Sequence, residues 1–355
     1  MRILGIESSC DETAASIVDD GRTLISNVVV SQIDIHTAYG GVVPEVAARS
    51  HIEAVLPVVT EALKKGNSTW DDIDAIAVSY APGLVGSLLI GTLTARTLAL
   101  LKKKPLYPIH HVEAHVYANF LLEKAPEFPM LALIVSGGHS QLVLFRDHGD
   151  YELLGQTLDD AVGEAFDKVA KIIGLPYPGG PSIAKAALHG NPKAYPLPKA
   201  KLKDPYNFSF SGLKTAALRR VQAEVGVGYD FPSFKLAERL SESQRNDFAA
   251  SFQRVAIETL VDKTERAYGE YQPKSVVIAG GVAASQELRR QLSERLPLPI
   301  AYADPALCTD NAAMIATLGY YYAQKHAPTD PHILEVMPSL SMTTTAWAHS
   351  PTLGG

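Results

Sequence analysis

The sequence predicts an α/β protein built from two similar units, and three observations lead to this prediction. Short apolar strands alternate with segments of helical periodicity along most of the chain. A strand, a tight polar turn and a second strand begin near residue 3 and again near residue 131. The length of 355 residues suits one large domain or two of ordinary size. We therefore expect a duplicated α/β unit with a ligand cleft between its copies.

In the first half of the chain, strands are predicted at residues 2–6, 13–18, 23–30, 73–78 and 106–109. Helices are predicted at 44–64, 86–101 and 112–122. The helix at 44–64 has apolar residues at helical spacing, among them Val55, Leu56 and Val59. The helix at 86–101 is rich in small residues, which favours close packing.

In the second half, strands are predicted at 130–135, 141–145, 151–154, 275–279 and 300–303, and helices at 161–173, 244–268, 286–295 and 310–324. Many prolines and glycines predict an irregular segment at 174–214. The expected division is an N-terminal lobe (1–110) joined by the C-terminal helix 311–324, a C-terminal lobe (111–310) with a loop-rich insertion near 174–240, and a mobile tail (325–355).

Composition limits the classes of function. The formal net charge of −6 excludes a protein that holds nucleic acid by bulk positive charge, so such a substrate needs a local basic patch or a basic partner. Two cysteines, Cys10 and Cys308, are too few for a disulfide framework, and we expect a cytoplasmic protein. The N-terminus lacks the features of a signal peptide, and the apolar stretch 84–101 contains too many polar residues to span a bilayer.

Two histidines, His111 and His115, are the sharpest local signal. Their spacing at the start of a predicted helix puts both imidazoles on one face, as a divalent transition metal requires. The alternative is a pair of surface or capping histidines. The pattern is not that of a metalloprotease, because Val112 stands where the catalytic Glu must follow the first His, and Glu113 falls on the wrong side of the helix.

Three glycine-containing turns have the composition of ligand-binding loops. The turn 136–140 and the pair Gly280-Gly281 each follow a predicted buried strand, where backbone can approach a phosphate or a nucleotide closely. The loop 177–181 (YPGGP) could line the same cleft. Each turn alone is equally compatible with an ordinary hairpin or surface connection, and it is their combination that favours a nucleotide cleft.

Acidic residues occur at two further places. The turn 7–13 holds three carboxylates, and in a functional reading Asp11 and Glu12 lie near the reacting centre. Its alternative is a solvated loop. Asp310 lies at the start of the last predicted helix. It could be the missing metal carboxylate, or else Asp310 or Thr309 could cap the helix. Spacing alone does not decide between these roles.

Taken together, six motifs in order resemble one known family. They are ESSCDETA at 7–14, HVEAH at 111–115, VSGGH at 135–139, FSFSGLKT at 208–215, AGGV at 279–282 and CTDNAAMIA at 308–316. This set is similar to the universal tRNA threonylcarbamoyltransferase family, called TsaD in bacteria and once described as an O-sialoglycoprotein endopeptidase (Gcp). The resemblance covers about residues 1–324.

The resemblance implies a fold of the actin, sugar-kinase and heat-shock-chaperone (ASKHA) type, with two RNase-H-like lobes around a nucleotide cleft. It implies transfer of the threonylcarbamoyl group of threonylcarbamoyl-AMP to the exocyclic 6-amino group of the adenosine at tRNA position 37, in tRNAs that read ANN codons, with release of AMP. One iron(II) or zinc ion is implied, with the ligands His111, His115 and Asp310.

By the same resemblance, the substrate-binding positions are Ile134, Val135, Ser136, Gly137, Gly138, Asp167, Gly180, Gly280, Gly281 and Ser285. The sequence departs from the family at two of its positions. Ser285 replaces an Asn, and Ala184 stands where some members have an acidic residue. The implied partners are tRNA, the shorter paralogue TsaB, for which the helix at 86–101 is a candidate contact, and the P-loop ATPase TsaE.

Three other functions compete with the transferase. The old family label suggests a metallopeptidase, against which the position of Glu113 argues. An ATP-hydrolysing kinase of the same fold has no use for the histidine pair. A non-catalytic scaffold need not keep His111, His115 and Asp310 together.

The best local basic patches for tRNA are residues 102–104, the lysines at 199, 201 and 203, and Arg219-Arg220. Each of them is equally compatible with an ordinary run of charged residues on a solvated surface.

Overall fold

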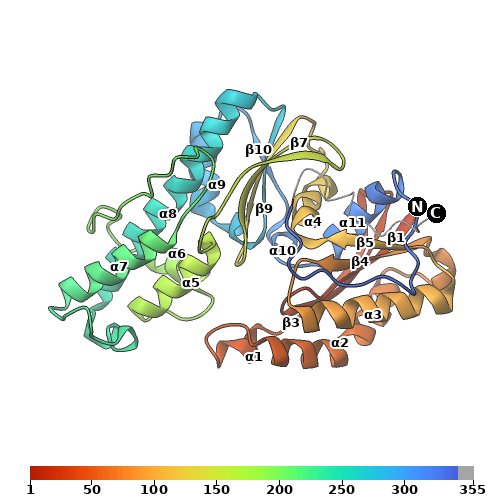
Figure 1. Ribbon diagram of the computed structural model, residues 1–355, viewed down its shortest axis with the longest axis horizontal. Coiled ribbons are helices and arrows are strands. Elements are labelled where there is room, and N and C mark those ends of the chain that lie inside the picture. Colours follow the sequence, from red (N-terminus) through yellow and green to blue (C-terminus); the bar gives the residue numbers. More distant parts are fainter. Residues whose placement is uncertain (343–355) are drawn as a thin grey trace. The chain divides into compact units, whose positions relative to one another are not determined.

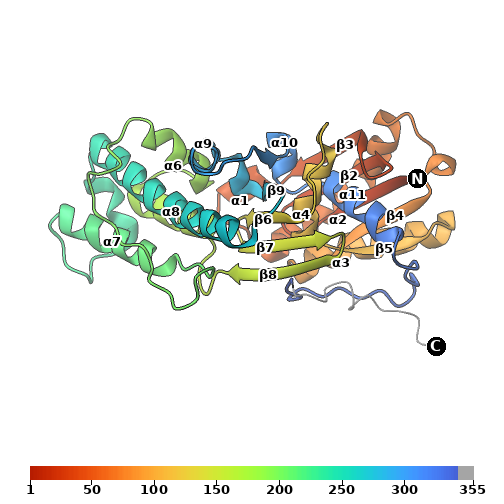
Figure 2. The ribbon, with the colours of Figure 1, turned by 90° about the horizontal axis from the view of Figure 1, so that it is seen from above.

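The computed structural model describes residues 1–342, and the chain forms two compact units (Figures 1 and 2). The first unit contains residues 1–129, 145–152 and, of the described C-terminal part, 301–342. The second unit contains residues 130–144 and 153–300. The first unit thus includes residues 111–129, beyond the expected lobe of 1–110.

Each unit is built on a five-stranded sheet, and the two sheets have the same topology. The first sheet has the order β3-β2-β1-β4-β5, formed by β1 (Arg2–Glu7), β2 (Glu12–Asp19), β3 (Thr23–Ser31), β4 (Ala75–Ala81) and β5 (Leu106–His110). The second has the order β8-β7-β6-β9-β10, formed by β6 (Met130–Val135), β7 (Ser140–Asp147), β8 (Asp150–Gln156), β9 (Ser275–Ala279) and β10 (Ile300–Tyr302). In each, the first strand pairs in parallel with the fourth. The predicted duplication is confirmed.

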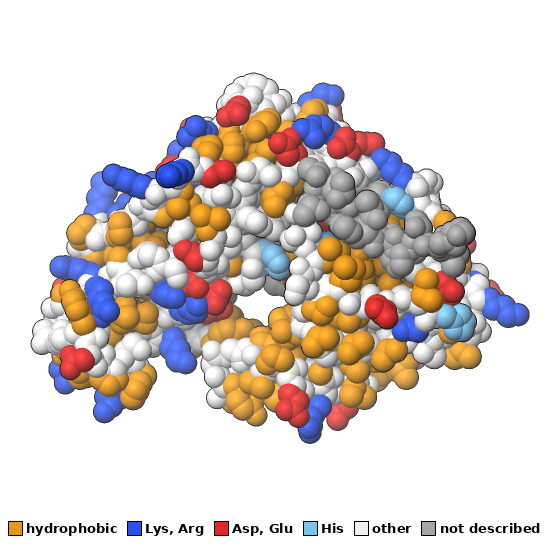
Figure 3. Space-filling model, in the orientation of Figure 1, with side chains coloured by type: hydrophobic (Ala, Val, Ile, Leu, Met, Phe, Trp, Pro, Cys, Tyr) orange, Lys and Arg blue, Asp and Glu red, His pale blue; other side chains and the backbone are white. Residues whose placement is uncertain are grey.

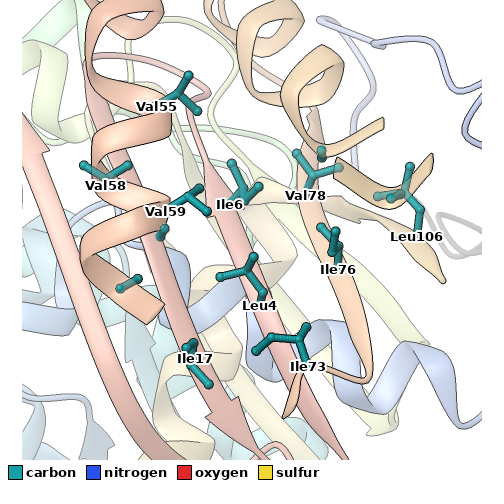
Figure 4. Close-up of a cluster of buried hydrophobic side chains, with 14 of the residues drawn as sticks. Leu4, Ile6, Ile17, Val55, Val58, Val59, Ile73, Ile76, Val78 and Leu106 are labelled. Carbon is teal, nitrogen blue, oxygen red and sulfur yellow. The ribbon is translucent and has the colours of Figure 1, made fainter. Parts of the chain in front are cut away.

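The core of the first unit lies between its sheet and the helices α2 (Pro44–Lys65) and α3 (Val85–Lys102). Figure 4 shows Leu4 and Ile6 of β1 on the same side as Val55 and Val59 of α2. Residues alternate between the two faces of a strand, so even positions of β1 serve this core. Each fully buried Leu, Ile or Val contributes about 1.5–3 kcal/mol through the hydrophobic effect.

The opposite face of β1 packs against α11 (Ala312–Ala323). Gly5 makes this close contact possible, because a Cβ at that position would lie 2.3 Å from the Ala312 carbonyl oxygen. The sheet therefore fixes the start of α11, and Asp310 stands just before that start.

Helix α3 is long and apolar enough, by length and composition, to cross a membrane, with a mean hydropathy of 1.3 and a third of it buried. The expectation that this stretch is too polar was wrong, because its Gly, Ser and Thr residues lower the hydropathy only slightly. In the structure α3 packs against α2 and β4.

The segment 325–342 differs from the mobile tail expected from its composition. Thr329 forms a β-bridge with Leu106, and Leu334 is fully buried. The guanidinium of Arg96 in α3 donates hydrogen bonds to the carbonyl oxygens of Pro331, His332 and Leu334. These contacts join segments far apart in sequence, which is why composition gave no sign of them. The remainder of the expected tail, 343–355, lies outside the described residues.

The second unit carries five longer helices: α5 (Val162–Ile173), α6 (Gly179–Ala187), α7 (Ser211–Glu224), α8 (Glu242–Tyr271) and α9 (Gln286–Arg295). The shorter helices are α1 (Ile33–Thr37), α4 (His111–Tyr117) and α10 (Pro305–Cys308), all in the first unit. Single 3₁₀ turns form at Trp70–Asp72, Ala118–Leu121, Ser233–Lys235, Ala237–Arg239 and Gly281–Ala284. The helix predicted at 112–122 is thus α4 followed by a 3₁₀ turn.

Candidate functional site

The histidine pair lies on α4, which begins directly after β5. His110 caps the helix by accepting a hydrogen bond from the Glu113 amide at 3.3 Å. His111 and His115 are both buried, and their ring centroids are 4.7 Å apart. The predicted placement of the two imidazoles on one helix face is therefore confirmed.

Asp310 completes a group of three possible metal ligands with these histidines. Its Oδ1 lies 3.3 Å from His115 Nε2 and 3.6 Å from His111 Nε2. One ligand atom from each residue lies within 4.8 Å of the others. The helix cap is supplied instead by Asn311, whose side chain accepts from the Met314 amide at 3.1 Å. Asp310 is therefore not the helix cap, and its role as a metal ligand stays a prediction that this geometry fits.

The donor set fits a metal ion. Both ring nitrogens of His115 are buried, and within residues 1–342 neither makes a hydrogen bond, so that Nδ1 is without a partner and Nε2 has only the Asp310 carboxylate nearby. A buried polar atom without a partner costs about 1–3 kcal/mol, a cost that coordination would remove. Two imidazoles and one carboxylate leave coordination positions open for water or substrate, as in catalytic rather than structural sites.

A residue that the sequence analysis did not select, Glu7, holds the first histidine. Its fully buried carboxylate lies with Oε2 at 3.0 Å from His111 Nδ1 and accepts the Ser9 amide through Oε1 at 2.5 Å. The Ser9 hydroxyl is also 3.1 Å from Nδ1. Burial lowers the pKa of His111, but Glu7 and Asp310 outweigh it and raise that pKa to about 9. The carboxylate directs Nε2 toward the metal position.

The other carboxylate of the motif, Glu113, belongs to a different environment. It is buried, and its Oε2 accepts from the Tyr151 hydroxyl at 3.5 Å. It is not among the residues grouped around Asp310. This agrees with the expectation that Glu113 faces away from the metal position.

Asp11 and Glu12 lie at the turn between β1 and β2, in the same unit as the triad. Burial and the charges of Asp310 and Asp11 raise the pKa of Glu12 to about 9. Glu12 also accepts from the Ser31 hydroxyl at 3.2 Å. Burial raises the pKa of the neighbouring Cys10 thiol strongly, so this cysteine is a poor nucleophile. The catalytic roles of Asp11 and Glu12 stay predictions.

In the second unit, the structure brings two of the predicted glycine turns together. Gly280 has a φ of +86°, and a Cβ there would lie 2.5 Å from the Val135 carbonyl oxygen. Ile134 and Val135 are fully buried, backbone included, so the structure does not expose these two predicted positions to a ligand. Gly137, Gly138 and Gly281 have open space where a Cβ would stand. Ligand backbone contacts are therefore possible at the ends of β6 and β9.

Three further predicted positions lie on helices of the second unit. Asp167 on α5 accepts the Gly179 amide at 2.6 Å, and burial raises its pKa. Gly180, at the start of α6, has open space around its Cα. The Ser285 hydroxyl caps α9 by accepting from the Leu288 amide at 3.3 Å, which leaves its hydrogen for a ligand. Ala184 is half-buried on α6 and offers no polar group.

Solved structures with a similar fold share little sequence with this chain. Full-length HypF in its phosphate- and nucleotide-bound form is 13% identical with a TM-score of 0.59, and the match covers 92% of this chain and 47% of that one. The activator of 2-hydroxyisocaproyl-CoA dehydratase from Clostridium difficile is 13% identical with a TM-score of 0.50, covering 92% and 96%. The duplicated sheets and these likenesses show a fold of the actin, sugar-kinase and heat-shock-chaperone type, as predicted.

Sequence relatives identify the family within this class. The family described as tRNA N6-adenosine threonylcarbamoyltransferase (TsaD) matches residues 23–317. The Thermomicrobium roseum protein of that name is 51% identical over 343 residues, covering 93% of this chain and 94% of the relative. The Bacillus subtilis protein is 50% identical over 324 residues, covering 90% of each. The chain belongs to this family, and the prediction of a tRNA-modifying transferase is confirmed.

Proposed function

We propose that the chain transfers a threonylcarbamoyl group from threonylcarbamoyl-AMP to the 6-amino group of adenosine 37 in tRNAs that read ANN codons. In this reaction the adenine nitrogen forms a bond with the carbamoyl carbon. The bond from that carbon to the phosphate oxygen breaks, and AMP leaves with the electron pair. The amine loses a proton in the same sequence. The observation that carries the proposal is the triad of His111, His115 and Asp310 in a chain of this family.

Residues of the first unit would have separate roles in the transfer reaction. His111, His115 and Asp310 would hold a metal ion, whose chemistry there would be Lewis-acid polarisation of the acyl group and a template for it. Glu7 and Ser9 fix the orientation of the His111 ring. Asp11 or Glu12 would orient the incoming amine and accept its proton.

The second unit supplies backbone for the donor. The open turn at Ser136, Gly137 and Gly138 suits the acyl-phosphate end, since side chains do not block close approach there. The turn at Gly280-Gly281 suits the adenosine end.

Reconstitution tests the activity directly. The metal-loaded chain is incubated with threonylcarbamoyl-AMP, unmodified tRNA and the two partner proteins, and the nucleosides are analysed by mass spectrometry. We expect threonylcarbamoyladenosine with the wild type and none with His111→Ala plus His115→Ala. Full activity of that double variant would overturn the mechanism. Cleavage of a glycoprotein that depends on the metal would favour the metallopeptidase instead.

The metal would be iron(II) or zinc. Two histidines and one carboxylate form the ligand set of many iron(II) oxygenases and of some zinc hydrolases, so the ligands alone do not choose. Purification without oxygen, followed by elemental analysis and by activity after loading with each metal, separates the two. His115→Ala is expected to lose the metal under both conditions.

The exposed face of α2 and α3 would bind the shorter paralogue, TsaB. Val85, Leu89 and Leu93 follow one another at four-residue intervals on α3 and are exposed, as are Ile52 and Leu56 on α2. Figure 3 shows hydrophobic side chains gathered at the lower right, over these helices. Contiguous exposed apolar surface of this kind is typical of protein contacts. We also propose that the P-loop ATPase TsaE joins this complex. The same proposal places the chain in the cytoplasm.

A charge placed in this face tests the contact. Leu93→Glu is expected to abolish a stable complex with the paralogue in size-exclusion chromatography with light scattering, because a carboxylate would be buried without a partner. Leu188→Glu, on an exposed position of the second unit, is the matched control and should leave the complex intact.

A further inference from the structure

The loop between α7 and α8 exposes two aromatic side chains. Tyr229 is 73% exposed and Phe234 is 69% exposed. Single exposed apolar residues are ordinary, but these two lie five residues apart on one connection of the second unit. Figure 3 shows basic and hydrophobic side chains next to one another over α7, at the left edge of the view. We refer to Arg219, Tyr229, Phe231, Phe234, Lys235 and Arg239 as the aromatic–basic loop.

The cations of the aromatic–basic loop lie over its rings. The guanidinium of Arg219 is 4.2 Å from the Tyr229 centroid, and that of Arg239 is 4.6 Å from the Phe231 centroid. The ammonium of Lys235 is 5.8 Å from the Phe234 centroid. Lys235 and Arg239 are exposed and Arg219 is half-buried, so a ligand can still reach these positive charges.

The three cations of the loop have no carboxylate at ion-pair distance in the described part of the chain. Arg219, Lys235 and Arg239 form no ion pair with a carboxylate anywhere in residues 1–342. By contrast, Arg290 is paired with Glu287 and Glu294, and Arg295 with Asp262 and Glu265. The same connection also carries Asp230 and Glu238, but neither forms an ion pair with these cations within residues 1–342, which leaves the cations available to a ligand.

A buried amide holds the loop in place. The Nε2 atom of Gln222 on α7, a residue that is almost fully buried, donates to the carbonyl oxygens of Tyr229 and Phe231, each at 3.4 Å. Arg219 adds a hydrogen bond to the Tyr229 carbonyl oxygen at 3.3 Å. Leu236 is fully buried and anchors the far end. The rings are therefore presented from a fixed backbone, which lowers the entropy cost of binding.

We propose that the aromatic–basic loop binds unstacked bases of a single-stranded RNA loop. Exposed rings stack on bases of any sequence, while unpaired cations contact the phosphates between them. The inference rests on the proposed function, because the substrate adenosine lies in the anticodon loop of tRNA, which offers such bases. An acidic peptide would engage the cations but would leave the two exposed rings without a role.

Binding of the full-length chain to a labelled, unmodified anticodon stem-loop tests this inference by fluorescence anisotropy. Tyr229→Ala combined with Phe234→Ala is expected to weaken binding about tenfold or more, the effect of removing the rings on which bases stack. Tyr229→Phe keeps the ring and should bind like the wild type. Lys235→Gln combined with Arg239→Gln should lower the slope of log Kd against log salt by about 0.7 for each phosphate that the variant no longer neutralises.

Leu188→Ala is the matched control, because Leu188 is an exposed apolar residue of the same unit without a ring. Melting curves of all variants should coincide, since the altered side chains are exposed. Wild-type affinity in the double alanine variant, or no binding of the stem-loop by the wild type, would overturn the proposal. Loss of a protein partner with unchanged RNA affinity would overturn it too.

The outcomes separate this inference from the proposed function. Ring-dependent RNA binding without formation of threonylcarbamoyladenosine would leave the loop assignment standing and remove the reaction. Formation of the product by the wild type, with normal RNA binding by the alanine variant, would leave the reaction standing and remove the loop assignment.

Discussion

The Oε2 atom of Glu7 lies 3.0 Å from Nδ1 of His111, and this contact joins the last residue of β1 to the first residue of α4. The two residues are 104 positions apart in sequence. They meet because β1, β4 and β5 run parallel, so that the ends of β1 and β5 lie at the same edge of the sheet. The sheet topology thus builds the metal position from segments that the sequence separates.

Replacing Glu7 by Gln should weaken metal binding about 10–100-fold, the usual effect of losing a carboxylate that orients a metal-bound histidine. The amide side chain can satisfy only one of its two present partners, His111 and the Ser9 amide, and it carries no charge. Competition between the full-length chain and a chelator for zinc measures the dissociation constant without recourse to activity.

The control for this change is Glu45→Gln, at an exposed carboxylate of the same unit whose only ion-pair partner among residues 1–342 is Arg49. It should bind zinc as the wild type does. Equal affinities in the Glu7 variant and the wild type would show that His111 needs no carboxylate to hold its orientation.

Sequence reasoning reached the candidate site only in part, for a physical reason. The spacing of His111 and His115 is local, since four residues of a helix place both rings on one face. Glu7 has no such signal, because its role depends on a strand pairing that spacing does not reveal. Asp310 was ambiguous for a related reason, because a helix cap and a metal ligand can stand at the same position in the sequence. The structure shows that Asn311 caps the helix, so Asp310 is not the cap.

Replacing Gly280 by Ala should destabilise the second unit by about 2 kcal/mol or more. The φ of +86° strains any L side chain, and the new Cβ would lie 2.5 Å from the Val135 carbonyl oxygen at the end of β6. Urea unfolding measures the loss. Gly281→Ala is the matched control, because its Cβ would meet nothing within 4 Å, and a similar loss in both variants would contradict this explanation.

The fold was predicted well where periodicity is strong and poorly where it is weak. The helix at α9 was predicted with the bounds that the structure gives, Gln286–Arg295. Helix α7 was missed, because it buries only the narrow stripe of Leu213, Ala217, Val221 and Gln222. Helix α6 falls in the segment 174–214, which was predicted to carry loops and short helices without bounds for any of them; a proline such as Pro181 is tolerated in the first turn, where amides have no helical acceptor.

Removing the guanidinium of Arg96 should release the segment 325–342 from α3. Three backbone carbonyls, those of Pro331, His332 and Leu334, would lose a charged donor, and we expect Arg96→Ala to cost about 2–3 kcal/mol of stability. Limited proteolysis followed by mass spectrometry should then show cleavage within 325–342. Arg49→Ala, which removes only an exposed ion pair on α2, should resist cleavage like the wild type.

The turn between β7 and β8 should make stability depend on pH. His148 stacks on Tyr321 at a centroid distance of 3.9 Å, and its Nδ1 lies 3.1 Å from the Tyr117 hydroxyl. Burial lowers the pKa of His148 to about 4, and the nearby Lys325 lowers it further, while Asp147 opposes them. Because the folded-state pKa is below the unfolded value of 6.5, the unfolded chain binds the proton first.

The contribution of His148 to stability is therefore complete above about pH 6.5 and is lost as the pH falls toward about 4, a change of about 2 kcal/mol once solvent screening of this partly exposed ring is allowed for. His148→Phe keeps a ring against Tyr321 but cannot take up a proton, so its free energy of unfolding should fall less over this range. Urea titrations at several pH values measure the difference. His332→Gln, at an exposed histidine, should follow the wild type, and an unchanged pH dependence in His148→Phe would show that the imidazole is not the group that titrates.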